Sequence, residues 1–150
     1  MSKLRAEIPP AELRRFKRWM DSLGNKVTTE ARVLLYSTLR SIEFGAIRSA
    51  PVDYGLLRSS IRHRLNHGSL SGFVMANKLY APYMEFGTGA YVNVPQDVFN
   101  YGITQEYLQS IRGRGVRKVN IKPKPYLFPA TRLAVKDMEA KLLKMGFKKQ

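Results

Sequence analysis

Apolar side chains recur at helical spacing in the first part of the chain. After two prolines at positions 9 and 10, which suit the first turn of a helix, Leu13, Phe16 and Met20 follow at intervals of three and four residues. Basic side chains occupy several of the positions between them. This pattern predicts an amphipathic N-terminal helix within residues 1–25.

A second, longer helix is predicted to follow. Thr28 or Thr29 can cap its N-terminus, because a threonine hydroxyl accepts a hydrogen bond from a free N–H of the first turn. The helix should end by Ala50, since the residue before Pro51 is pushed out of helical geometry. Its apolar stripe consists of Ala31, Leu34, Leu35, Thr38, Ile42 and Ala46.

In the middle of the chain, the side chains alternate between two sides instead of recurring at helical spacing. Residues 61–66 place Ile61, His63 and Leu65 on one side, which predicts a strand, and residues 68–72 form a hairpin loop before a return strand at 73–76. Short helices are predicted at 80–86 and 104–112, and a further strand at 119–121. Residues 91–121 as a whole are predicted to be an extended insertion or loop.

A closing helix is predicted to open at Pro129 and to end at Gly146, followed by a basic tail at 147–150. Its stripe consists of Leu133, Met138, Leu142 and Met145. These elements predict one α+β domain over residues 1–150. In it, the N-terminal helix, the long second helix and the C-terminal helix pack on a small, mainly antiparallel β-sheet.

Charge changes this picture by pointing to a partner. The chain has 26 Lys and Arg against 11 Asp and Glu, a formal net charge of +15, which indicates contact with nucleic acid, an anionic membrane or acidic protein. The excess lies at the two ends: residues 51–100 contain four basic and three acidic side chains. No apolar run approaches the ~20 residues of a membrane span, so we expect no membrane partner.

Three segments stand out between these elements. The first is Ala-Pro-Val-Asp-Tyr-Gly-Leu-Leu-Arg-Ser-Ser-Ile at 50–61, the second is Tyr-Ala-Pro-Tyr-Met-Glu-Phe-Gly-Thr-Gly at 80–89, and the third is Lys-Pro-Tyr-Leu-Phe-Pro-Ala at 124–130. Their glycines and prolines favour corners between elements. Glu85 lies among aromatic residues and needs a partner, for which we expect backbone N–H groups of its own turn, Arg58, or an arginine of a neighbouring subunit.

In this order, the three segments resemble motifs of the head–tail joining, or neck, proteins of long-tailed bacteriophages, also described as tail-completion proteins. The resemblance covers roughly residues 28–145. Two departures are that Tyr54 stands where the family usually has Thr, and that residues 91–121 exceed the expected spacing. The residues matching the motifs are Pro51, Asp53, Gly55, Leu57, Arg58, Tyr80, Tyr83, Glu85, Phe86, Gly87, Thr88, Pro125 and Pro129.

The resemblance implies a non-enzymatic virion protein of the neck, made and assembled in the bacterial host cytoplasm. Such proteins form rings, here of twelve or six copies, beside the portal, adaptor, stopper and tail-terminator proteins and around the channel for double-stranded DNA. Tyrosine is enriched at interfaces, so Tyr91 and Tyr101 are candidate subunit contacts, whereas we expect Tyr80 and Tyr83 in the core. Candidate contacts to channel DNA or to an acidic partner are Arg112, Arg114, Arg117, Lys118, Lys122 and Lys124.

Two other classes of protein remain as alternatives. One is a free basic nucleic-acid-binding protein of the nucleoid or ribosome, and the less favoured one is a small metal-dependent nuclease, in which Asp53 and Glu85 would have to pair. We expect no catalytic site, cofactor or metal. The chain has no cysteine, and its two histidines, His63 and His67, have no evident third ligand.

Overall fold

The computed structural model describes residues 3–21, 25–52, 55–66, 68, 70–112 and 120–146, and of residues 12, 16, 19–21, 25–28 and 112 it describes the backbone only. Helices and a small antiparallel sheet make up the described chain, so the predicted α+β class is confirmed. In chain order the elements are β1 (Leu4–Glu7), α1 (Pro10–Asp21), α2 (Asn25–Ser49), α3 (Leu56–Ser60), β2 (Ile61–Asn66), β3 (Ser71–Ala76), α4 (Ala81–Phe86), the 3₁₀ helices η1 (Gly89–Tyr91) and η2 (Gln96–Tyr101), α5 (Gln105–Arg112) and α6 (Leu127–Lys144).

The sheet has three antiparallel strands in the order β1-β3-β2. Because successive side chains of a strand point to opposite faces, one face collects the buried residues and the other collects the exposed ones. The predicted hairpin of β2 and β3 is confirmed. The strand β1 was not predicted, since four residues with two apolar positions give too short an alternation to recognise.

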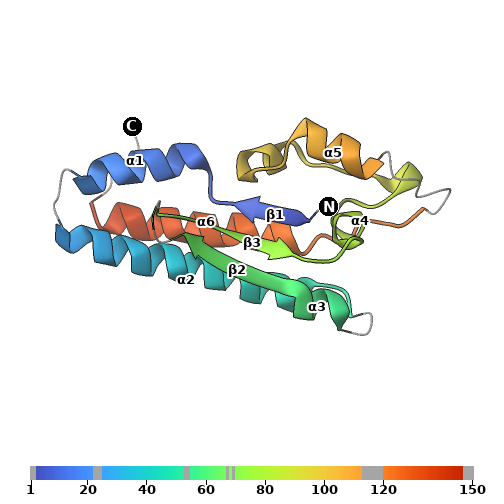
Figure 1. Ribbon diagram of the computed structural model, residues 1–150, viewed down its shortest axis with the longest axis horizontal. Coiled ribbons are helices and arrows are strands. Elements are labelled where there is room, and N and C mark those ends of the chain that lie inside the picture. Colours follow the sequence, from blue (N-terminus) through green and yellow to red (C-terminus); the bar gives the residue numbers. More distant parts are fainter. Residues whose placement is uncertain are drawn as a thin grey trace.

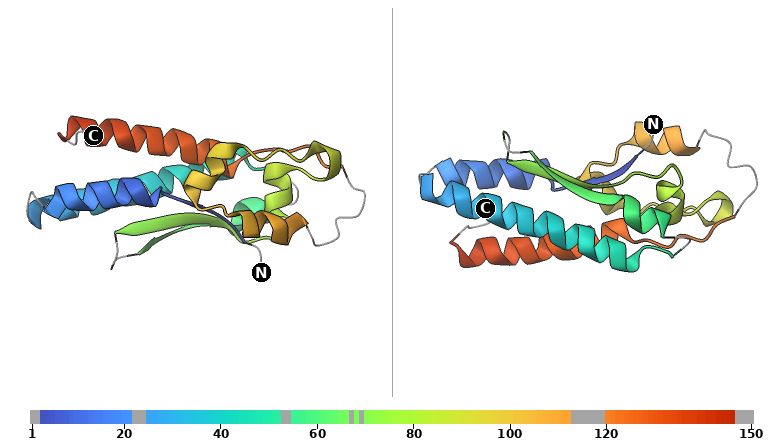
Figure 2. Two further views of the ribbon diagram at one scale, coloured as in Figure 1. Left: turned by 90° about the horizontal axis from the view of Figure 1, so that it is seen from above. Right: turned by 60° about the horizontal axis from the view of Figure 1, so that its bottom comes forward.

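Helix α2 covers the buried face of the sheet, and α6 runs back along α2 in the opposite direction (Figures 1 and 2). The two helices approach closely at Gly45, where an added Cβ would lie 3.1 Å from the Cβ of Ala130. The predicted stripe of α2 is buried throughout, and Leu39 joins it. The core therefore lies between the sheet and this helix pair.

Two predicted helix starts are wrong. Helix α2 begins at Asn25 rather than after Thr28 or Thr29, and asparagine and threonine are both capping residues, so composition does not decide between them. Helix α6 begins at Leu127 rather than Pro129. Both predicted ends hold, at Ser49 before the proline and at Lys144 before Gly146.

The predicted stripe of α6 is only partly right. Met138 and Leu142 are buried, but Leu133 is 72% exposed. One face of helix α6 packs on α2 and the core. This face begins with the first two residues of the helix and continues through Thr131, Ala134 and Val135, and Leu133 does not belong to it. None of the described helices is long and apolar enough to cross a membrane.

The elements from α4 to α5 gather at the end of the molecule opposite the tip of α1 (Figure 1). The helices predicted at 80–86 and 104–112 are confirmed as α4 and α5. The strand predicted at 119–121 is wrong for its described part, because Asn120 and Ile121 belong to no strand. Their backbone instead follows the C-terminal end of α4, where the candidate site lies.

Candidate functional site

The first motif segment closes the C-terminal end of α2. The last carbonyl groups of a helix have no partner within the helix. The side chain of Arg58 in α3 is such a partner. Its Nε donates to the carbonyl oxygen of Ala50 at 2.9 Å, and its Nη2 lies 3.5 Å from the carbonyl oxygen of Arg48. Gly55 makes the corner with a φ of 68°, and the side chain of Leu57 is buried below it. Asp53 lies outside the described residues.

Glu85 of α4 joins the second segment to the third. Its Oε2 accepts hydrogen bonds from the backbone N–H groups of Tyr126 and Leu127 at 2.8 and 2.9 Å, and its Oε1 accepts one from Phe128 at 3.0 Å. These are N–H groups at the start of α6, which carry the positive end of the helix dipole. Glu85 therefore acts as a cap that comes from 41 to 43 residues away in the sequence.

This arrangement corrects the prediction for Glu85. The two expected partners within the chain are not used, because the N–H donors belong to α6 rather than to the turn of Glu85 and Arg58 bonds to the end of α2. A contact with an arginine of a neighbouring subunit stays a prediction. Glu85 is 3% exposed. Burial raises its pKa, and the three N–H bonds and the charge of Arg132 act against that increase.

The backbone of the second segment is also tied to residues 120–124. The N–H of Thr88 donates to the carbonyl oxygen of Ile121 at 2.9 Å, and the N–H of Ile121 donates to the hydroxyl of Thr88 at 2.9 Å. The N–H of Lys124 donates to the carbonyl oxygen of Met84 at 2.7 Å. We call the residues that make these contacts and those of Glu85 the junction: 84–88, 120–124 and 126–128.

Gly87 is the tightest point of the junction. Its φ of 77° is one that residues with a side chain rarely adopt. A Cβ there would lie 2.8 Å from the carbonyl oxygens of both Ile121 and Tyr91. Glycine is therefore required at this position by backbone conformation and by space.

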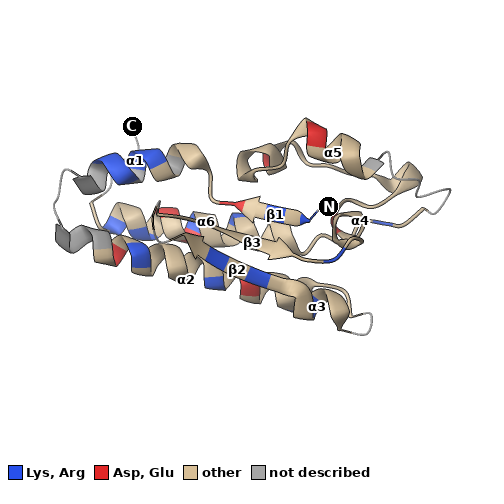
Figure 3. Cartoon of the chain, viewed as in Figure 1, with Lys and Arg blue, Asp and Glu red and all other residues tan. Residues whose placement is uncertain are grey.

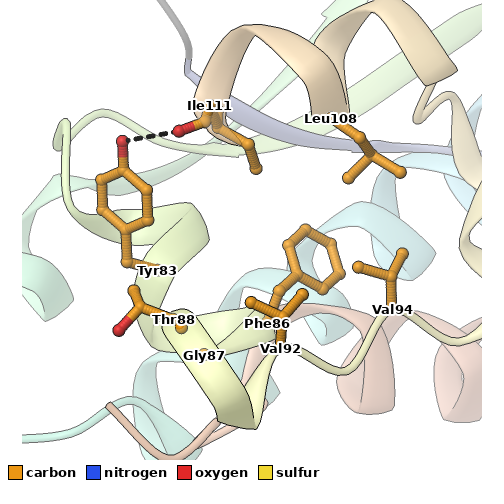
Figure 4. A pocket seen from close by; sticks show the side chains of 9 residues that line it. Tyr83, Phe86, Gly87, Thr88, Val92, Val94, Leu108 and Ile111 are labelled. Carbon is orange, nitrogen blue, oxygen red and sulfur yellow. Dashed lines mark hydrogen bonds between the residues drawn. The ribbon is translucent and has the colours of Figure 1, made fainter. Parts of the chain in front are cut away.

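A cavity of about 430 Å³ opens beside the junction, between α4, η1 and α5 (Figure 4). None of the described residues that line it is charged, and apolar groups of Phe86, Val94, Leu108 and Ile111 face it. The hydroxyl of Tyr83 donates to the carbonyl oxygen of Ile111 at 3.2 Å across one side. The described lining of the cavity is therefore mainly apolar, with the hydroxyl groups of Tyr83 and Thr88 as its polar part.

The predicted tyrosine positions are partly wrong. Tyr80 was expected in the core but is 37% exposed, because it precedes α4 on the outer side of the corner. Tyr83 is only half-buried, although it packs against the core. Tyr101 is half-buried with its ring centroid 6.2 Å from that of Phe128 in the same chain, whereas Tyr91 is 45% exposed. A subunit contact through Tyr91 or Tyr101 stays a prediction.

The predicted basic loop falls largely outside the described residues, which exclude Arg114, Arg117 and Lys118. Arg112 is the last residue of α5, and its side chain is not described. Lys122 and Lys124 are exposed beside the junction, and the Nζ of Lys122 lies 5.6 Å from the ring centroid of Tyr91. Pro125 and Pro129 are exposed as well and flank the first residues of α6.

Two contacts between polar side chains far apart in the sequence were missed by the sequence interpretation. His63 of β2 pairs with Glu43 of α2, and Arg132 of α6 pairs with Asp97 of η2. The partners lie 20 and 35 residues apart, so no local pattern could have revealed them. Within the described ranges, no three His, Asp or Glu side chains are grouped so as to hold a metal ion.

Comparison with known proteins adds no relative to this geometry. No protein-family model, curated protein or solved structure matches the chain.

Proposed function

We propose that this chain is a structural protein of the bacteriophage neck, which joins the DNA-filled head to the tail as part of a ring around the DNA channel. The observation that carries the proposal is the junction. The second and third segments of the family resemblance lie far apart in the sequence, yet Glu85 of one segment holds the first N–H groups of the other. Segments that match a family in order and also pack together support the resemblance more than isolated matches.

The surface near the junction supports assembly with other copies. Six large apolar side chains are exposed on the elements at this end of the molecule: Val52, Leu56, Leu79, Tyr80, Tyr91 and Val92. Exposed apolar and aromatic side chains of this kind are those that protein–protein contacts cover. A closed ring repeats each contact in every subunit, so individually weak contacts suffice. We propose no catalytic role for the chain. We propose that its partners are among the portal, adaptor, stopper and tail-terminator proteins.

The test is the location and copy number of the chain in phage particles. Mass spectrometry of purified particles should detect it, and cryo-electron microscopy should place it in a twelvefold or sixfold ring at the head–tail junction. Its absence from particles that contain the other neck proteins would overturn the proposal, and tight, salt-sensitive binding of free DNA or RNA by a monomer found only in the host cell would favour the nucleoid or ribosomal alternative.

A matched pair of variants sharpens this test. Leu79 is 61% exposed near the junction, and Leu143 is 56% exposed near the far end of α6. Leu79→Asp should lower incorporation into particles by roughly tenfold or more, as the loss of an apolar interface contact would. Leu143→Asp should leave incorporation near that of the wild type. Equal effects of the two changes would argue against a contact surface near the junction.

A further inference from the structure

The outer face of the sheet is the side that α2 and α6 leave uncovered (Figures 1 and 2). Alternation along the strands directs eight side chains to it. Two of them, Asn66 and Ser71, lie at the hairpin end, and the other six include three arginines: Arg5, Glu7, Arg62, Arg64, Phe73 and Met75. All six are exposed or half-exposed. Their neighbours on the other face, such as Ile61 and Val74, are fully buried.

Strand register places these side chains in two rows. Arg5, Met75 and Arg62 are opposite one another, and Glu7, Phe73 and Arg64 form the next row. Residues two apart on a strand are about 7 Å apart, and strands separated by one other strand are about 10 Å apart. Arginines of both edge strands therefore flank a strip of apolar side chains from β3 (Figure 3).

The charges of this face are unevenly matched. Arg5 forms an ion pair with Glu7, with 2.5 Å between Nη2 and Oε1, and its guanidinium lies 3.8 Å from the ring centroid of Phe73. Arg62 donates from Nη1 to the carbonyl oxygen of Ile61 at 2.7 Å, which uses one of the five N–H groups of a guanidinium. Neither Arg62 nor Arg64 forms an ion pair with another described residue.

We propose that this outer sheet face binds the phosphate backbone of double-stranded DNA through Arg62 and Arg64, with Arg5 beside them. Guanidinium groups form paired hydrogen bonds with phosphate oxygens, and strands hold the two arginines at a fixed spacing. One aromatic ring, already covered by Arg5, leaves little room for base stacking, so the binding is independent of base sequence and weakens with salt.

This surface is separate from the predicted basic loop, whose contact with DNA stays a prediction. Binding at this surface rests on the proposed function only for the source of the DNA, which in a neck would be the genome passing through the channel. Binding by the purified chain is measured apart from ring formation and apart from particles. The two proposals can therefore fail separately.

The experiment measures fluorescence anisotropy of a labelled 30-base-pair duplex with the full chain between 50 and 200 mM salt. Arg62→Glu/Arg64→Glu should weaken binding by roughly tenfold or more and lower the slope of log K against log salt by about 2, one for each lost phosphate contact. The control is Arg40→Glu/Arg48→Glu, which makes the same charge change on the exposed side of α2, the helix that covers the opposite face. It should change affinity by less than about threefold.

Circular dichroism should show both variants folded. If the glutamate variant does not fold, Arg62→Gln/Arg64→Gln should lose affinity in the same way, and Arg62→Lys/Arg64→Lys should retain most of it. Equal losses in the sheet-face variant and the α2 control would overturn the proposal, because attraction would then follow net charge alone. Binding of polyglutamate with no binding of the duplex would also overturn it and would indicate an acidic protein partner.

Discussion

The junction and the outer sheet face differ in how far their charged side chains are buried and paired within the chain. At the junction a single carboxylate, Glu85, is 3% exposed and is held by three backbone N–H groups. On the sheet, Arg62 and Arg64 are exposed, and neither forms an ion pair with a described acid. Burying a charge is costly unless it is paired, so the buried one must be matched within the chain.

This difference distinguishes residues that stabilise the fold, such as Glu85, from residues proposed to bind a partner, such as Arg62 and Arg64. Substitutions at the junction should lower the stability of the fold, because they remove hydrogen bonds that are made within the chain. Changes on the sheet face should affect binding and leave stability within about 0.5 kcal/mol of the wild type, as is usual for surface substitutions.

The largest effect is expected for Glu85→Ala. Removing the carboxylate leaves three N–H groups at the start of α6 without acceptors in a buried place, and an unsatisfied buried donor costs about 1–3 kcal/mol. We expect the free energy of unfolding to fall by about 3 kcal/mol in urea denaturation. Glu30→Ala, on the exposed side of α2, is the control and should change it by less than about 0.5 kcal/mol. Equal stabilities of the two variants would refute the capping role.

The next effect is expected at Gly87, with Gly55 as a matched comparison. Both glycines have a positive φ, 77° and 68°, so alanine is strained at both positions. Only at Gly87 would the new Cβ meet backbone oxygens, whereas nothing lies within 4 Å at Gly55.

Gly55→Ala should therefore cost about 1 kcal/mol and Gly87→Ala about 1 kcal/mol more, since the junction must open to admit a methyl group. Thermal unfolding monitored by circular dichroism measures both. Equal melting temperatures of the two variants would show that the close approach at Gly87 does not affect stability.

A smaller effect is expected for Arg58→Ala. The side chain closes the end of α2 through two carbonyl groups, but water can reach these groups when the side chain is removed. The expected loss of unfolding free energy is about 1 kcal/mol, close to that of other helix caps. Arg58→Lys should recover only part of it, because an ammonium group cannot reproduce the paired geometry. Full recovery by lysine would mean that charge alone acts at this position.

The sequence predicted those parts of the molecule that depend on neighbours within about one helical turn. The stripe of α2, its end before Pro51, the β2–β3 hairpin and the helices α4 and α5 all follow from local spacing. The stripe of α6 failed at Leu133 because Leu133 is five residues before Met138, whereas residues that share a helix face are three or four apart, as Ala134 and Val135 are from Met138.

The candidate site was predictable only as a set of residues. Glu85 was recognised as a carboxylate in need of a partner, but its partners lie 41 to 43 residues further on, and backbone N–H groups leave no mark in a sequence. The outer sheet face was hidden for a related reason. Arg62 and Arg64 alternate visibly, but Arg5 joins them only through β1, which was too short to predict.

The smallest effect concerns Asp97 and Arg132, a half-exposed pair that links η2 to α6. The hydrogen bond from Arg132 lowers the pKa of Asp97 below its ordinary value, and the charge of the guanidinium acts in the same direction. A carboxyl whose pKa is lowered by folding adds stability above its unfolded pKa, and this contribution disappears as the pH falls through the lower, folded value.

Asp97→Asn should therefore destabilise the protein by less than about 1 kcal/mol at pH 7, as is usual for an exposed pair. The difference from the wild type should shrink as the pH is lowered from 4 toward 2. Asp137→Asn is the matched control, because Asp137 forms a single ion pair with Lys141, at 2.8 Å between Oδ2 and Nζ, on the exposed surface of α6. Urea denaturation at pH 7, 4 and 3 measures the difference. A difference that grows on acidification would contradict the pairing, because a protonated aspartate gains nothing from a neighbouring guanidinium.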